Sequence, residues 1–427
     1  MRHRGKRAII GSKGGETVVI ADLHIHSRYS RATSRDGDLE HLDLWARKKG
    51  IGLVGTGDFT HPAWRMELRE KLEPAEEGLY VLKKPYRLLD EGESPRFVVT
   101  GEISSTYKRD GKTRKVHNLL LLPSLEKGEE LSERLSQVGN LNADGRPILK
   151  LDSEDLLGML LDASPEGELI PAHIWTPHFS MFGAFSAFST LEECFGDLAG
   201  HIHGIETGLS SDPPMNAGVP ALEGLRLISN SDAHSPGKLG REASLLEIDL
   251  SYQNLLDAIR QGEESGWRGT IEFFPQEGKY HWDGHRACGV SMAPEEGGKR
   301  GNICPVCGKK MTVGVCHRVL ELSGAGKADM APYESLAPLP ETIAASLGVG
   351  VTSVKVKRLY ESLLCQLGPE FFILRQAKIE DVEKLAGACV AQGLLNLREG
   401  KVCWEPGYDG VYGKLHLLTE QEREELK

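Results

Sequence analysis

The chain has 427 residues, of which 40% are apolar and 26% are charged, as in an ordinary globular protein that is long for a single domain. Its apolar runs are strand-sized and none reaches the ~18–20 residues that a bilayer span requires, so we expect no membrane partner. The formal net charge of −11 argues against a general nucleic-acid binder, although the local charge around a site decides whether a phosphate binds there.

Residues 1–16 are basic and lack the continuous apolar core of a secretion signal, so we expect a flexible extension. Across residues 17–275, short apolar runs alternate with amphipathic segments. The clearest helix covers residues 39–49, with Asp38 as a candidate N-cap and Gly50 as a candidate C-terminal stop. Further helices are expected at residues 152–161 and 190–198. The expected strands cover residues 17–20, 51–54, 97–100, 116–122, 169–172, 202–206 and 225–229. This alternation favours a mainly parallel sheet, closed or nearly closed into a barrel.

Each of these apolar runs carries a side chain suited to metal binding at or near one end. These side chains are Asp22, His24, His26, Asp58, Glu102, His117, His173, Glu206, Asp232 and His234. Imidazole and carboxylate are ligands of Zn²⁺, Mn²⁺ and Fe²⁺. Because chemistry in α/β barrels gathers at the C-terminal ends of the strands, we expect these groups to meet there. His117 fits this pattern least well, since it precedes its apolar run. A cluster of this kind predicts metal-assisted hydrolysis.

The first of these motifs is Asp22-x-His24-x-His26. Residues two apart on a strand face the same side, so both imidazoles can reach one ion. Asp22 could orient a ligand imidazole from behind. Asp232 and His234 repeat the spacing near the other end of this region.

Residues 276–322 contain too few apolar residues to form a core of their own. The spacing His285-x2-Cys288-x15-Cys304-x2-Cys307 predicts a tetrahedral structural Zn²⁺ site in this module. The alternatives to His285 as the fourth ligand are Cys316, His317 and His281. The basic residues of the module, which indicate either a phosphate contact or a solvated surface, are Lys299, Arg300, Lys309, Lys310 and Arg318. The other cysteines are scattered and form no disulfide framework, so we expect a cytoplasmic protein.

Residues 323–330 are expected to form a linker, and residues 331–427 a mainly helical C-terminal domain. The expected helices of this domain cover residues 340–347, 354–367 and 379–391.

The segments ADLHIHSRYSRATS, GTGDFTH, GEIS and SNSDAHSPGKLGREA together resemble the PHP (polymerase and histidinol phosphatase) superfamily. The resemblance implies a distorted seven-stranded (βα)7 barrel with a trinuclear metal site at the strand C-termini. For the first ion it implies the ligands His24, His26, Glu102 and Asp232. For the second it implies Glu102 as a bridge, with His117 and His173. For the third it implies Asp58 and His234. The catalytic set implied in this way is His24, His26, Glu102, Asp232 and His234.

The chain departs from the superfamily pattern at the third ion. Many PHP proteins have His where this chain has Asp58, and a further His where it has Tyr29, Ser30 and Arg31. The third site is then either weaker, or completed by His61, by water or by a substrate phosphate. Glu206 remains open as a ligand or as a group that orients one.

The longer segments HIWTPHFSMFGAF, CFGDL, IETGLSSDPPMN, YHWDGHRACGV, CPVCGKKMTVGVCHRV and PGYDGVYG occur in the order seen in the endonuclease Q family, which the chain resembles from residue 20 to its tail. His178 stands where an aromatic residue is expected. The resemblance implies a DNA repair endonuclease that nicks on the 5′ side of deaminated bases (uracil, hypoxanthine, xanthine) and of abasic sites. It implies two or three divalent cations in the barrel (Zn²⁺, Mn²⁺ or Mg²⁺) and one structural Zn²⁺.

A base inside a duplex must be turned outward to reach such a site. The candidate substrate-binding residues are Arg28, Tyr29, Ser210, Ser211 and Asn230. Turn and cap chemistry is the alternative for the last three, and solvated or packed surface for the first two. Trp175 and Phe179 could stack on a base or pack in the core. Lys355, Lys357 and Arg358 could touch DNA or form an ordinary solvated helix face.

Two other functions remain open at this stage. One is a PHP-type phosphatase that acts on a small molecule, which would need neither the zinc module nor the tail. The other is a binding module that senses DNA without cleaving it, which would need no full set of metal ligands.

Overall fold

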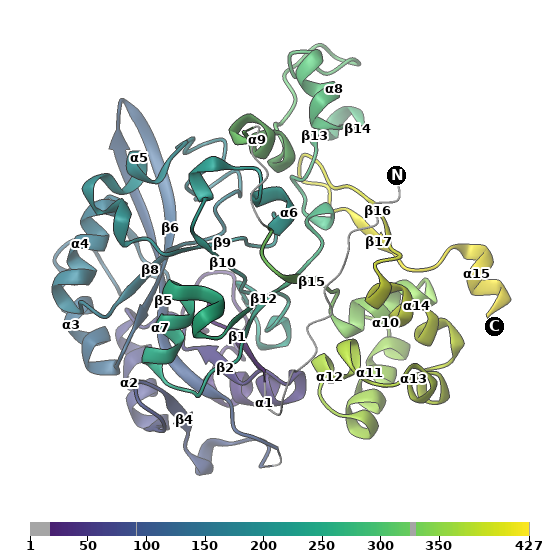
Figure 1. Cartoon of the computed structure of the whole chain (residues 1–427), viewed down its shortest axis with the longest axis horizontal. Helices are drawn as coiled ribbons and strands as arrows, with labels where there is room; N and C mark the ends of the chain where they lie inside the picture. Colours follow the sequence, from purple (N-terminus) through teal and green to yellow (C-terminus); the bar gives the residue numbers. More distant parts are fainter. Residues whose placement is uncertain (1–17, 91, 325–329, 427) are drawn as a thin grey trace.

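The computed structural model describes residues 18–90, 92–324 and 330–426. The extension expected at residues 1–16, and most of the linker expected at residues 323–330, lie outside these ranges. The fold is mixed α/β, with a central sheet covered by helices and a helical region towards the C-terminus (Figure 1). Among the described residues, no helix is both long and apolar enough to span a bilayer.

The main sheet is built around β1 (Val19–Asp22). On one side β1 runs parallel to β2 (Leu53–Gly55), which runs parallel to β5 (Arg96–Arg109). On the other side it runs antiparallel to β11 (Ala243–Leu246), which is antiparallel to β12 (Trp267–Glu272). The expected first, second and third strands are therefore present, whereas β11 and β12 were not predicted.

The sheet continues past β5 through two more antiparallel pairings. β6 (Lys112–Leu122) pairs with β5, and β8 (Glu168–Pro171) pairs with β6. A separate parallel pair consists of β9 (Gly204–Glu206) and β10 (Arg226–Ile228). This pair lies between the two ends of the run just described, because β9 contacts β8 and β10 contacts β12. Further strands of the sheet are β3 (Leu72–Pro74), β4 (Tyr80–Leu82) and β7 (Ile148–Leu149).

The expectation of a mainly parallel sheet is wrong, because β1–β11, β11–β12, β5–β6 and β6–β8 are all antiparallel. The clearest reason lies between β5 and β6. Only Asp110 and Gly111 connect them, with φ values of 53° and 74°. A two-residue Asp-Gly loop with both φ angles positive is the preferred turn of an antiparallel hairpin. It returns the chain directly, without a crossover helix.

Most of the helices that cover the sheet begin at side-chain caps. α1 (Leu39–Lys49) starts after Asp38, whose carboxylate accepts the His41 N–H, and stops at Gly50 with φ 81°, as predicted. Ser124, Asp152 and Ser251 cap three others in the same way. The further helices of this region are α2 (Pro62–Lys71), α3 (Leu125–Ser136), α4 (Ser153–Ala163), α5 (Leu191–Phe195), α6 (Pro213–Asn216) and α7 (Tyr252–Gln261).

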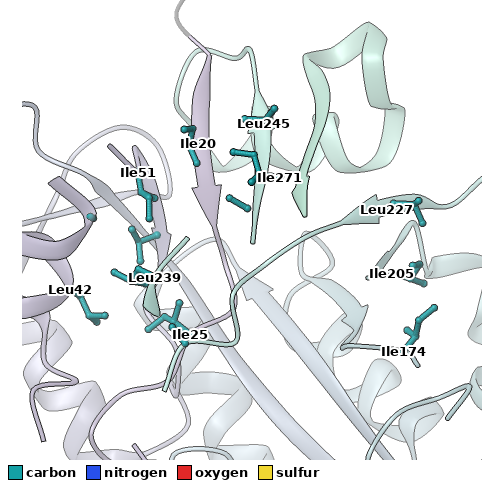
Figure 2. Close-up of a cluster of buried hydrophobic side chains, with 14 of the residues drawn as sticks. Ile20, Ile25, Leu42, Ile51, Ile174, Ile205, Leu227, Leu239, Leu245 and Ile271 are labelled. Atoms are coloured by element: carbon teal, nitrogen blue, oxygen red, sulfur yellow. The ribbon is translucent and has the colours of Figure 1, made fainter. Parts of the chain in front are cut away.

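The core lies between the sheet and these helices. Figure 2 shows Ile20 of β1 next to Leu245 of β11 and Ile271 of β12. All three side chains are fully or almost fully buried. Each such side chain contributes roughly 1.5–3 kcal/mol by leaving water. Gly55 and Gly57 lie so close to the backbone of residues 23 and 25 that a side chain at either position would collide with it. These two glycines allow the end of β2 to pack tightly against the end of β1.

The C-terminal half does not form a separate body. β15 (Tyr333–Ser335) pairs in parallel with β12 and so extends the main sheet. The tail hairpin of β16 (Cys403–Glu405) and β17 (Lys414–His416) lies between the C-terminal helices and the cysteine-rich segment (Figure 1), where Tyr408 bridges to Trp282. The domain boundaries stay predictions, and these contacts cross them.

The elements of this half are as follows. The cysteine-rich segment contains β13 (Asp283–His285), β14 (Val290–Met292), α8 (Pro294–Lys299) and α9 (Val315–Leu322). The C-terminal helices are α10 (Leu339–Leu347), α11 (Val354–Leu367), α12 (Glu370–Arg375), α13 (Ile379–Ala386), α14 (Ala388–Glu399) and α15 (Glu420–Glu425). The single helix predicted at residues 379–391 is two helices, because Gly387 adopts φ 88° and breaks the helix there.

Two buried carboxyl groups lie opposite each other in the protein interior. The antiparallel register that pairs Ala243 with Ile271 puts Glu242 opposite Glu272. One oxygen of each, Oε2 of Glu242 and Oε1 of Glu272, has no hydrogen-bond partner among the described residues. Burial raises the pKa of both carboxyl groups, and the mutual repulsion of the two charges raises that of Glu242 further. At neutral pH the pair therefore retains a proton.

We predict that Glu272→Gln increases the free energy of unfolding by roughly 1–3 kcal/mol at pH 8 and by much less at pH 5. The native protein keeps a proton that an unfolded glutamate loses above a pKa of about 4.3, so wild-type stability falls as pH rises through neutrality. The amide that this substitution introduces donates to Glu242 without needing that proton. Melting temperatures of both proteins across this pH range test the prediction. Glu126→Gln, at an exposed position, serves as the control. An equal effect of Glu272→Gln on stability at pH 5 and at pH 8 would contradict the prediction.

Candidate metal centre

The first and last predicted motifs meet at the end of β1. Ile25 forms a parallel bridge with Ala233, and the His26 N–H donates to the Ala233 carbonyl at 2.9 Å. Asp22 secures this meeting, because its carboxylate accepts the N–H and hydroxyl of Ser231 and the Gly240 N–H at 2.6–3.0 Å. We expected Asp22 to orient a ligand imidazole. Its hydrogen bonds instead hold the loop that carries Asp232.

The residues at three strand ends adopt left-handed backbone conformations. The φ angles of Asp58, His173 and Asp232 are 48°, 29° and 47°. Such angles are uncommon for residues other than glycine and persist only where the surroundings impose them. Their gathering at one edge of the sheet marks a functional site.

One group of candidate ligands consists of His24, His26, Glu102 and Asp232, whose ligand atoms all lie within 4.8 Å of one another. Nε2 of His26 lies 3.0 Å from Oδ1 of Asp232 and 3.3 Å from Oε2 of Glu102. Nε2 of both histidines and Oδ1 of Asp232 are buried without a hydrogen-bond partner among the described residues. Buried nitrogen and oxygen atoms that lack hydrogen-bond partners and converge on one point are suited to binding a cation.

A second group consists of Glu102, His117 and His173. Oε1 of Glu102 lies 2.6 Å from Nδ1 of His117 and 3.1 Å from Nε2 of His173. The other oxygen of Glu102 faces the first group. Glu102 therefore has the geometry of a carboxylate that bridges two ions. His117 belongs to this group although it precedes its apolar run in the sequence.

Carboxylates behind the first group orient its two imidazoles. Nδ1 of His24 lies 3.0 Å from Glu206, and Nδ1 of His26 lies 3.0 Å from Asp58. A proton held at Nδ1 by a carboxylate leaves the lone pair of Nε2 directed at the centre. Glu206 also accepts the His173 N–H at 2.8 Å and the Asn230 side-chain amide at 3.0 Å. Of the two roles left open for Glu206, orientation is the one that these contacts support.

The charges of the site are strongly coupled. Burial disfavours ionisation of Glu102, but His117, His24 and Arg146 outweigh it and hold the pKa of its carboxyl well below the usual range. Burial would lower the pKa of His24, yet the carboxylates of Glu206 and Glu102 raise it well above its ordinary value. The field at the centre is therefore negative and favours positive charge.

Two residues predicted at a third ion do not join either group. Asp58 uses its second oxygen on the Ser27 N–H and on the hydroxyls of Ser27 and Ser30, at 2.6–2.8 Å. His234 is partly exposed at the open side of the site, with its ring 4.7 Å from that of His26. The third ion stays a prediction, and Asp58 already has an orienting role.

The predicted substrate-binding residues differ in their surroundings. Arg28 and Tyr29 both bond to Glu67 at 2.6 Å near the rim. Ser211 and Asn230 are buried, and their polar groups are used within the protein. For these two, the contacts fit the turn and positioning alternative, and direct contact with a base stays a prediction. Ser210 is partly exposed and stays a candidate.

The aromatic candidates also differ in their surroundings. Trp175 is buried and donates from Nε1 to Asn216 at 2.7 Å, which places it in the core. Phe179 lies against His117, with ring centroids 4.9 Å apart. His178 stacks on the exposed Phe185 at 4.0 Å, so this pair forms part of the rim.

The cysteine-rich segment brings together the four side chains named first for zinc. Ligand atoms of His285, Cys288, Cys304 and Cys307 all lie within 4.8 Å of one another. The three alternative ligands lie elsewhere: Cys316 contacts His281 at 3.3 Å, and His317 contacts Asp283 at 2.6 Å.

The sequence reasoning missed Arg146, whose Nη1 donates to Oε2 of Glu102 at 3.0 Å. It also missed Ser27, Ser30 and Thr176, which hydrogen-bond to Asp58 and His173. Arg146 follows no strand, so the strand-end pattern had no means of finding it. The Asp-Gly turn that precedes it indicates only a loop.

Comparison with known proteins covers up to 96% of the chain. Residues 338–401 match the sequence profile of the MJ0043 C-terminal domain family. The chain is 32% identical over 259 residues to MJ0043 of Methanocaldococcus jannaschii; this match covers 58% of the chain and 32% of that protein. The chain thus spans about a third of the length of MJ0043. YqxK of Bacillus subtilis is 28% identical over 415 residues, which cover 93% of this chain and 99% of that one.

Two solved structures match over their full length. The lesion-specific endonuclease PfuEndoQ from Pyrococcus furiosus has 31% identity and a TM-score of 0.82, and the match covers 96% of this chain and all of that one. Endonuclease Q bound to a 27-mer duplex with an abasic lesion at its active site has 32% identity and the same TM-score, over 96% and 98% of the two chains. The fold and the site define a metal-dependent hydrolase. The chain belongs to the endonuclease Q family.

We predict that Glu206→Gln weakens divalent metal binding by about 10–100-fold while the protein stays folded. The neutral amide is a weaker acceptor for the His24 N–H, so the imidazole becomes less basic and less well oriented. Titration of the metal-free protein with Mn²⁺ or Zn²⁺ measures the change. Glu192→Gln, at an exposed position of α5, is the matched control, and equal affinities for the two variants would contradict the role of Glu206.

Proposed function

We propose that the protein is a metal-dependent DNA repair endonuclease that hydrolyses the phosphodiester on the 5′ side of deaminated bases (uracil, hypoxanthine, xanthine) and of abasic sites. The observation that carries this proposal is the shared carboxylate of Glu102, which joins two groups of candidate metal ligands at one edge of the sheet. Support for a DNA substrate comes from the likeness, over nearly the whole chain, to an endonuclease Q bound to an abasic duplex.

We infer that His24, His26, Glu102 and Asp232 hold one divalent cation, and that Glu102, His117 and His173 hold a second. The candidate ions are Zn²⁺, Mn²⁺ and Mg²⁺, and Asp58 and His234 are the proposed residues of a third. Bound there, such ions would lower the pKa of water and offset the charge that develops on the phosphoryl oxygens. Asp232 and His234 are the most exposed of these side chains, so they border the side from which DNA enters.

The rest of the chain fits this function. We infer that the sheet is a distorted PHP barrel, whose ring runs through the contacts of β8 with β9 and of β10 with β12. We infer one structural Zn²⁺ held by His285, Cys288, Cys304 and Cys307. Thiolate ligands of this kind suit a reducing compartment, which supports the cytoplasm. The basic side chains of the zinc module and of α11 are proposed to support DNA binding, except Arg318, which donates to carbonyls of residues 182 and 188.

A labelled duplex with a single uracil, hypoxanthine or abasic site tests the activity. We predict one nick, on the 5′ side of the lesion, that requires a divalent cation and disappears with a chelator. Asp232→Asn removes a charged ligand of the first group and should reduce cleavage by at least about 10³-fold, while anisotropy still detects lesion binding. Cleavage of undamaged duplex at the same rate would exclude lesion specificity. Full activity of the variant would exclude the proposed ligand set.

The zinc module has its own test. We predict that Cys304→Ser removes one equivalent of zinc, as counted by metal analysis, and weakens binding to lesion DNA, while the ions of the barrel stay bound. Serine is a poor zinc ligand, and this segment has little core to hold it without the ion. Cys365→Ser, at an exposed position of α11, is the matched control. Unchanged zinc content in Cys304→Ser would count against the site.

A further inference from the structure

A small cavity opens beside the second group of candidate ligands. Its volume is about 170 Å³, and its wall includes His117, Phe179, Asp144 and the two arginines Arg31 and Arg146. Because His117 also belongs to the second group of candidate ligands, the cavity borders the candidate metal centre. In a chain with a net charge of −11, two guanidinium groups at such a place are unusual.

Arg146 reaches furthest into the site. Its Nη1 lies 3.0 Å from Oε2 of Glu102. Burial would lower the pKa of the guanidinium, but the negative charges of Glu102 and Asp232 outweigh it and raise this pKa. Its side chain is 22% exposed. Within the described part of the chain, Glu102 is the only side chain hydrogen-bonded to this guanidinium. Most of its N–H donors are therefore available to a ligand in the cavity.

The loop that carries Arg146 is built into the site. Oδ1 of the buried Asp144 accepts the backbone N–H of both Arg31 and Arg146, at 3.1 and 3.2 Å. The Gly145 N–H donates to the Tyr29 carbonyl at 2.9 Å. A side chain at Gly145 would collide with Asp58, so only glycine allows the loop this close. Asp144 thus fixes both arginines relative to the metal ligands.

Neutralising Glu102 is not a sufficient reason for Arg146. Four imidazoles already surround that carboxylate, at 2.6–3.6 Å. A fixed guanidinium repels divalent cations, so it weakens the binding of the ions that the other residues favour. A guanidinium beside divalent cations becomes favourable when an anion binds between them and offsets this repulsion. Guanidinium groups bind phosphate oxygens through two parallel hydrogen bonds.

We propose that this cavity is a phosphate subsite, in which Arg146 donates to a non-bridging oxygen of the scissile phosphodiester and Arg31 binds the neighbouring backbone phosphate. The inference rests on the proposed function and adds a substrate-contacting residue to it. Arg146 faces the carboxylate shared by both groups, where the reacting phosphorus must lie. Arg31 is 74% exposed at the mouth, where the next phosphate would pass.

The first test is Arg146→Gln, which keeps a donor but removes the charge. Single-turnover cleavage at saturating enzyme and metal should fall about 10²–10³-fold. Metal affinity should stay equal or become tighter, because a repelling charge is lost. Arg146→Lys should recover part of the rate, since it restores the charge without the two-pronged geometry. Arg134→Gln, on the outer face of α3, is the control and should leave both quantities unchanged.

Sulfur substitution at the scissile phosphate locates the contact. Sulfur accepts hydrogen bonds poorly, so at the oxygen bound by Arg146 the effects of sulfur and of Arg146→Gln should be less than additive. At the other non-bridging oxygen, the effects of sulfur and of Arg146→Gln on the cleavage rate should multiply. For the control Arg134→Gln, the effects of sulfur and of the substitution should multiply at both oxygens. Full additivity at both oxygens, or loss of bound metal in Arg146→Gln, would overturn the subsite and leave the endonuclease proposal intact. If the wild type cleaves no lesion under any metal condition, the proposed function fails and the subsite fails with it.

Discussion

The structure depends most on one buried carboxylate, that of Glu102 in the middle of β5. Leaving an ionised carboxylate uncompensated at such a depth costs several kcal/mol, so its neighbours are constrained. Its two oxygens face different sets of imidazoles, one from β1 and one from β6 and the end of β8. The strands that carry these imidazoles must therefore keep their relative positions for the charge to stay compensated. Cations would satisfy this requirement better than protonated histidines, since the Nε2 atoms of His24 and His26 and Oδ1 of Asp232 have no other partner among the described residues.

Glu206 ties this centre to the rest of the fold. It accepts hydrogen bonds from His24 after β1, from the backbone of His173 after β8, and from Asn230 after β10. Asn230 in turn accepts the Leu23 N–H at 2.7 Å. A single side chain thus links three strand ends that lie far apart in the sequence. The contacts that orient the imidazole of His24 are therefore also contacts that hold these strand ends together, so damage to one disturbs the other.

Sequence patterns could predict the candidate ligands because each of them follows or begins a short apolar run, and periodicity is a local property. The same reasoning could not assign Asp22, whose partners Ser231 and Gly240 are more than 200 residues away. It missed the antiparallel pair of β11 and β12, which places Glu242 and Glu272 together in the interior. It overlooked the Asp110-Gly111 turn, although that dipeptide is a recognised hairpin signal. Arg146 lies in a loop without periodicity, and its position depends on Asp144 and on the absence of a side chain at Gly145.

The net charge of −11 is a poor guide to how this surface meets an anionic polymer. Asp58, Glu102, Glu206, Glu242 and Glu272 are buried, and the first three face imidazoles rather than solvent. Burial keeps a proton on the pair formed by the other two. These groups therefore add little to the repulsion that DNA would meet. The exposed charges nearest the cavity include Arg31, and the candidate zinc segment carries Lys299, Arg300, Lys309 and Lys310 at its surface. Two divalent ions would add about four positive charges at the centre of this face. An acidic protein can thus present a locally positive path to a phosphodiester, because its buried acids either face imidazoles or retain a proton.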